Sequence, residues 1–99
     1  MESMTFAARQ NRFVLSVAPT SRARCRGCKR AVVKGETRLV THAFVRPGHG
    51  TCFVRHVSCV TAALLRELLA VYGSVERVPV ATCMNAEQTA GARESLNRI

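Results

Sequence analysis

Cys25-Arg26-Gly27-Cys28 and His56-Val57-Ser58-Cys59 are the two stretches that decide the fold of this 99-residue chain. Together they form the pattern C-x2-C…H-x2-C, with 27 residues between the two pairs. A two-residue gap lets both side chains of a pair turn toward one ion, and three thiolates with one imidazole form a closed tetrahedral donor set for zinc. Two such pairs at short spacing are not expected by chance among ordinary buried residues. The sequence therefore predicts one Zn²⁺ bound by Cys25, Cys28, His56 and Cys59.

The surroundings of the two pairs predict different local structures. The first pair lies in an Arg- and Gly-rich segment, which favours a tight turn, whereas the second opens an apolar run that favours the first turn of a helix. Cys52 lies four residues before His56 and is an alternative metal ligand, but it falls within a predicted strand, so Cys59 is preferred. We expect Cys52 and Cys83 to be small buried apolar residues.

The length and the cysteine count indicate one small domain. A chain of 99 residues has room for a modest core, and a structural metal commonly supplements a core of this size. Five cysteines without a secretory signal argue against a disulfide framework. No apolar run approaches the roughly 20 residues that span a bilayer.

Positive charge is confined to the half of the chain that carries the predicted metal site. The net charge is +9, and residues 1–59 hold eleven Lys and Arg against two Glu, while residues 60–99 hold four of each sign. Thirteen of the fifteen cations are Arg, whose planar fork matches phosphate oxygens. This segregation indicates a surface for a polyanion, with nucleic acid preferred over an anionic membrane because the basic segment lacks an amphipathic helical pattern.

The remaining patterns predict an α+β fold, a small zinc-stabilised finger in which an antiparallel hairpin packs on one main helix, with a second helix at the C-terminus. Residues 13–17, 37–45 and 51–55 are expected to be strands, the last two joined as a hairpin. A Leu-rich helix is expected from Ser58 to Tyr72, ended by Gly73, and a second from Ala86 to about Asn97 behind an Asn85/Gln88 capping box. Residues 74–82, which include Pro79, are expected to be extended or irregular. We expect residues 1–11 to be a flexible arm and 12–99 to be the domain, with a transit function of the arm as the minor alternative.

These residues resemble the poly(ADP-ribose) polymerase-type zinc finger over roughly residues 12–98. The resemblance rests on Arg22-Ala23-x-Cys25-x-x-Cys28, on the following Lys34-Gly35-x-x-Arg38, and on the long gap to His56-x-x-Cys59. It implies a zinc-dependent module that recognises DNA strand breaks or ends without sequence specificity, through phosphate contacts and base stacking. It also implies a role in DNA damage and a nuclear location, with an organelle or the cytoplasm as alternatives.

The resemblance also implies which residues contact DNA. Arg22 and Arg38 match phosphate-gripping positions, Arg24 lies beside the first of them, and apolar residues near the hairpin tip match those that stack on an exposed base pair. The expected DNA contacts are Arg22, Arg24, Arg38, Phe44, Val45 and Arg46, with Pro47 as a further candidate. The chain departs from the family beside His56, where Val54, Arg55 and Val57 replace the usual aromatic residues. We expect a freestanding finger without the catalysis of the larger family members.

Three other functions are weighed against DNA binding. A zinc-stabilised protein-interaction module does not need the one-sided charge, and an RNA-binding finger would need more than the four Phe and one Tyr present to build a stacking platform. An enzyme is not expected, nor is a small-molecule substrate or a sizeable pocket. Cys52 with His42 or His49 could form a thiolate pair, but no Asp or Asn lies nearby in the sequence to orient the imidazole.

Overall fold

The structure is a computed structural model that describes residues 11–46 and 49–99, with only the backbone described for residues 44–46 and 49. Residues 1–10 of the expected flexible arm lie outside the described residues. Asn11 is the last residue of that arm, and its side-chain amide Nδ2 donates to the Glu67 carboxylate at 2.7 Å.

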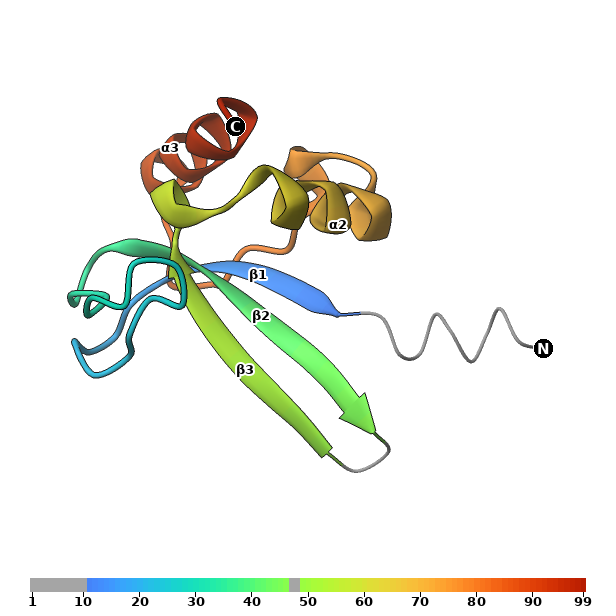
Figure 1. Cartoon of the computed structure of the whole chain (residues 1–99). Coiled ribbons are helices and arrows are strands. Elements are labelled where there is room, and N and C mark those ends of the chain that lie inside the picture. The colour runs from blue at the N-terminus through green and yellow to red at the C-terminus, as the bar shows by residue number, and fades with distance from the viewer. Residues whose placement is uncertain (1–10, 47–48) are drawn as a thin grey trace.

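Three antiparallel strands form the sheet, in the order β1-β2-β3 (Figure 1). They are β1 (Arg12–Val17), β2 (Thr37–Arg46) and β3 (His49–His56). All three predicted strands and the hairpin are confirmed, and the hairpin strands run slightly further toward the tip than the sequence indicated. A register shift between Phe44 and Arg46 ends the regular pairing there.

Two helices cover one face of the sheet (Figure 1). They are α2 (Ala62–Tyr72) and α3 (Ala86–Asn97). Strand alternation turns Phe13 and Leu15 of β1 and Leu39 of β2 toward them, and all three are fully buried. Leu68 of α2 and Leu96 of α3 complete the same core from the helix side. The α+β class is therefore confirmed.

The main helix begins four residues later than the sequence predicted. Val57–Cys59 form a separate 3₁₀ turn, η1, and Val60 is extended. Thr61 then caps α2, because its side-chain oxygen accepts from the Leu64 amide at 3.2 Å. The prediction that His56-x-x-Cys59 opens the α-helix is thus wrong: Thr61 caps α2 through the Leu64 amide, and His56 and Cys59 lie on the strand end and on η1.

The C-terminal part closes the core as the sequence indicated. Gly73 ends α2 at a φ of 87°, which favours glycine. Residues 74–82 are largely irregular but include a 3₁₀ turn, η2 (Val75–Arg77). The capping box of Asn85 and Gln88 is present, with the Gln88 amide donating to Asn85 at 2.7 Å and the Asn85 amide donating to Gln88 at 3.0 Å.

The segment between β1 and β2, residues 18–36, is here called the knuckle loop. It lies against β3, where the Arg26 amide donates to the Val54 carbonyl at 2.8 Å. Cys25 and Val32 from the loop are fully buried in a second, smaller apolar cluster with Val54 and Cys59. In residues 11–46 and 49–99, neither α2 nor α3 has the length and hydrophobicity that a bilayer-spanning helix needs.

Candidate metal centre

Four donor side chains from three separate segments meet beside the small apolar cluster. Cys25 and Cys28 come from the knuckle loop, His56 ends β3, and Cys59 ends η1. Their ligand atoms all lie within 4.8 Å of one another. The structure thus brings together the four residues that the sequence singled out, in an arrangement that can hold one metal ion.

The distances within this cluster suit a tetrahedral ion. His56 Nδ1 lies 3.4 Å from Cys28 Sγ and 3.7 Å from Cys59 Sγ. Zinc with Zn–S bonds of about 2.3 Å and Zn–N bonds of about 2.0–2.1 Å would place sulfur and nitrogen about 3.5 Å apart. The donor set and the spacing are therefore consistent with zinc, which these four side chains would hold through three sulfurs and Nδ1 of His56.

The Cys25 sulfur is prepared for a metal by the backbone around it. It accepts from the amides of Gly27 and His56, both at 3.3 Å, and from Cys28 at 3.5 Å. Burial acts to raise the pKa of Cys25, but these donors outweigh burial and lower the pKa from 9.0 to about 6. A thiolate at neutral pH follows, which is the form that binds metal.

Cys59 has the opposite tendency. Burial and then the neighbouring Cys25 and Cys28 raise the pKa of Cys59 from 9.0 to about 11. Thiolates packed this closely repel each other, so one sulfur of the cluster loses its proton more readily than another. A bound cation would relieve this repulsion.

Gly27 lies where the two pairs approach each other closely. A β-carbon at this position would lie 3.1 Å from Cys59 Cβ and 3.3 Å from the Cys59 carbonyl oxygen. The turn that follows reverses the chain at Lys29, which has a φ of 68°, and the Lys29 amide donates to the Cys25 carbonyl at 2.8 Å. The knuckle therefore packs tightly against η1.

Glu36 lies behind the imidazole, and sequence reasoning missed it. Its Oε1 is 3.5 Å from His56 Nε2 and accepts from the Val33 amide at 2.7 Å. A carboxylate behind a metal-binding histidine fixes the ring and its tautomer. The signal was present in the sequence, since Glu36 is the sole acid between Glu2 and Glu67.

An open depression of about 600 Å³ lies beside the cluster. It is lined by Cys28, Arg30, Ala31, Glu36, His56, Ser58 and Cys59. The depression is wide open to solvent, because the knuckle loop and η1 meet at the cluster without closing over it.

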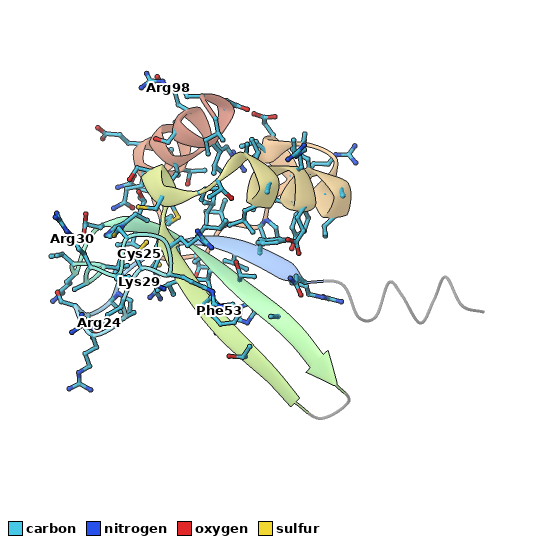
Figure 2. All side chains as sticks on the ribbon, viewed as in Figure 1. Arg24, Cys25, Lys29, Arg30, Phe53 and Arg98 are labelled. Carbon is cyan, nitrogen blue, oxygen red and sulfur yellow. The ribbon has the colours of Figure 1, made fainter. Side chains whose placement is uncertain are left out.

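Six cations of the knuckle loop are exposed. Figure 2 labels Arg24, Lys29 and Arg30 among them, on the solvent side of the loop near Cys25. They are Arg22, Arg24, Arg26, Lys29, Arg30 and Lys34, and we call them the basic surface. Within residues 11–46 and 49–99, the ion pairs are His56–Glu36 and Arg98–Glu94, so no described acid neutralises these cations.

Two members of the basic surface are positioned by further contacts. The Arg26 guanidinium carbon lies 3.9 Å from the centre of the Phe53 ring, and Arg24 donates to the Lys29 carbonyl at 3.4 Å. Arg38 differs from them, because it is half-buried and its Nε donates to Ser16 Oγ at 3.0 Å. Of the other predicted DNA contacts, the side chains of Phe44, Val45 and Arg46 lie outside the described part of the structure, as does Pro47.

Cys52 and Cys83 are both exposed, so the prediction that they are buried apolar residues is wrong. Cys52 lies on the face of β3 that the helices leave uncovered, and Cys83 lies in the segment before α3. Cys52 is not a member of the metal cluster. Its sulfur instead lies 3.1 Å from His42 Nδ1.

Comparison of the chain with models of known protein families and with curated proteins finds no match. The fold and the Cys₃His cluster therefore define its class, which is a small α+β domain with a candidate metal centre.

Proposed function

We propose that this protein is a zinc-binding module that binds nucleic acid through its basic surface, with duplex DNA at strand breaks as the preferred ligand. One observation carries the proposal: six exposed cations without a described acidic partner lie on the loop that the metal cluster holds. Phosphate binding by such a surface releases counterions and needs no base contact.

The metal centre gives this surface a fixed shape. Cys25 and Cys28 lie in the middle of the basic segment, so an ion shared with His56 and Cys59 would anchor the cations to β3 and η1. Side chains that are already positioned lose less entropy when they bind phosphates. A bound zinc with three thiolates would carry one net negative charge, which the surrounding Arg and Lys residues offset.

The helices offer little for reading a base sequence. Arg66 is the single cation of α2. In α3, Arg93 donates to the Glu76 carbonyl at 3.1 Å, and Arg98, directly after the helix, pairs with Glu94. The apolar sides of both helices also pack into the core. We therefore expect recognition of DNA structure, with little dependence on sequence.

Preference for broken DNA is the finer part of the proposal, and it rests on the resemblance to the poly(ADP-ribose) polymerase-type finger. A nick or an end exposes the flat face of a base pair, and stacking on it is worth about 1–3 kcal/mol per base. Phe44 and Val45 near the hairpin tip are the proposed stacking residues, with Arg46 beside them. A nuclear location follows from this proposal.

Charge-matched variants test the basic surface. Arg22→Gln/Arg30→Gln removes two exposed cations from the knuckle loop, whereas Arg66→Gln/Arg77→Gln removes two exposed cations from the neutral half. For zinc-loaded protein on duplex DNA, the first variant should reduce the magnitude of the negative slope of log K against log salt by about 2. The second variant should leave this slope almost unchanged. Equal effects of the two variants on the salt dependence would show that DNA does not bind at the basic surface.

Break preference is tested on nicked and closed circular duplex of the same sequence. The wild type should bind the nicked form more tightly, and Phe44→Ala should remove most of the difference while keeping the affinity for intact duplex. Equal binding of both forms by the wild type would refute break recognition. Preference for RNA, or no binding to any nucleic acid, would favour the RNA-binding or the protein-interaction alternative.

A further inference from the structure

His42 and Cys52 meet on the sheet face that the helices leave uncovered. Leu39 and Thr41 of β2 are buried on the helix side, so strand alternation turns His42 to the opposite face. The antiparallel register places His42 directly across from Cys52, and Cys52 Sγ lies 3.1 Å from His42 Nδ1. Both side chains are exposed, so a nucleophile and a base within hydrogen-bond reach face solvent.

Arg12 extends this pair into a row across all three strands. The register between β1 and β2 pairs Arg12 with His42, and Arg12 is exposed. The row therefore consists of a cation, an imidazole and a thiol, without an acid among its three members. Such a row suits a small substrate that carries carboxylates beside its reacting atom.

We propose that Cys52 is a site of thiol–disulfide exchange, with His42 as its general base and a small anionic disulfide, such as oxidised glutathione, as its substrate. The site is independent of the metal centre, because Cys52 is not among the cluster's donors.

The exchange balances without a further oxidant. His42 Nδ1 takes the proton of the Cys52 thiol, so the ring must carry its own hydrogen on Nε2. The thiolate attacks one sulfur of the disulfide, forms a new S–S bond and breaks the old one. The electron pair leaves with the second sulfur, which takes the proton from His42 and departs as a thiol. Arg12 holds a carboxylate of the substrate during the exchange.

The remaining cysteines provide the contrast. Cys25, Cys28 and Cys59 are the donors of the metal cluster, and in the loaded protein their sulfurs would be bound. Cys83 is as free and exposed as Cys52, but its sulfur has no hydrogen bond to a ring nitrogen among the described residues. Cys83 is therefore an internal control for an exposed thiol without a base.

The test uses the zinc-loaded full chain with oxidised glutathione, and site-resolved mass spectrometry measures the modification rate of each cysteine. Cys52 should react at least about tenfold faster than Cys83, because an adjacent base increases the rate of attack. His42→Gln should reduce the Cys52 rate to that of Cys83 and leave the Cys83 rate unchanged. Zinc content and circular dichroism of the variant show that its fold is kept.

A second disulfide tests the substrate class. Arg12→Gln should slow Cys52 with oxidised glutathione but not with the uncharged bis(2-hydroxyethyl) disulfide. Equal rates at Cys52 and Cys83 in the wild type, or a fast Cys52 that persists in His42→Gln, would overturn the site. Equal slowing by Arg12→Gln with both disulfides would overturn the anionic substrate.

Discussion

Glu36 is the residue, after the four donors, on which we expect metal affinity to depend most. Its carboxylate lies 3.5 Å from the His56 nitrogen that faces away from the sulfurs. Loss of such a partner typically costs about 10–100-fold in metal affinity. Glu36→Gln should weaken zinc binding within this range in competition with a chelator of known affinity.

The control for Glu36 is Glu87→Gln, which removes the same charge from the exposed first turn of α3. It should leave the zinc affinity unchanged. Equal zinc affinity of Glu36→Gln and the wild type would mean that the ring of His56 is fixed by packing alone.

The unequal thiols of the cluster set the pH dependence of metal binding. Above a pH of about 6, Cys25 is already ionised before the metal arrives, whereas Cys59, with a pKa of about 11, still holds its proton. Zinc must displace that proton, so the affinity should rise with pH through the neutral range. Below about pH 6, Cys25 must also release a proton, and the dependence should steepen.

The same two thiols affect the metal-free fold in opposite directions. The lowered pKa of Cys25 stabilises the fold above pH 9.0, and this contribution is lost as the pH falls toward about 6. The raised pKa of Cys59 favours the fold below pH 9.0, and this contribution is lost as the pH rises toward about 11.

Chelator competition between about pH 5 and 8, corrected for protonation of the chelator, measures how the zinc affinity depends on pH. A zinc affinity that does not change with pH would contradict the assignment of Cys25 and Cys59 as zinc ligands.

At the scale of elements, two glycines predict opposite effects of the same substitution. Gly27 lies in the knuckle, where a β-carbon would approach Cys59 Cβ to 3.1 Å, whereas a β-carbon at Gly91 in α3 would meet no atom within 4 Å outside the adjoining helix backbone. Gly27→Ala should destabilise the metal-loaded protein by roughly 1–3 kcal/mol because the knuckle must move away from η1. Gly91→Ala should stabilise it by about 0.5–1 kcal/mol, since alanine is favoured in a helix interior.

Denaturant unfolding of the zinc-loaded variants measures both effects. Zinc content shows whether Gly27→Ala acts through the metal centre, as we expect. Equal stability of Gly27→Ala and the wild type would show that the knuckle is not tightly packed against η1.

Periodicity and capping residues predicted most of the elements correctly. The alternation of apolar residues in β2 and the Asn85/Gln88 box of α3 are local signals, and local signals survive in the fold. The start of α2 was mispredicted because the apolar run continues through Val57 and Val60, although Thr61 is the cap. A hydrophobic pattern alone did not separate a 3₁₀ turn from the helix that follows it.

The candidate site divides in the same way. The four residues of the candidate metal centre were predictable because their spacing in the chain is typical of a fixed coordination geometry. The sequence contains the signal for Glu36, its single acid between Glu2 and Glu67, and it offers His42 or His49 as a partner of Cys52, but it does not decide either contact. Those contacts depend on which residues lie opposite each other in the sheet and on how the knuckle loop folds back. The exposure of Cys52 follows from the same register, which turns it away from the helices.

At the scale of the whole molecule, the two apolar clusters suggest that the fold has parts of different stability. The larger cluster joins β1 and β2 to α2 and α3, whereas the smaller one consists of Ala18, Cys25 and Val32 with Val54 and Cys59 beside them. Two of these five residues, Cys25 and Cys59, belong to the candidate metal centre, so we expect the smaller cluster to depend on a bound ion. Structural zinc contributes about 10–16 kcal/mol in small fingers, which exceeds what so few apolar residues can replace.

Chelation of zinc should therefore unfold the knuckle loop and its junction with β3 first, while α2 and the β1–β2 ladder persist. Hydrogen exchange should show early loss of protection at the amides of Lys29 and Val32, which bond within the loop. Cys59→Ala should reproduce this pattern, whereas Cys52→Ala and Cys83→Ala should keep the metal. Simultaneous loss of protection in α2 and the knuckle would contradict the separation of the two clusters.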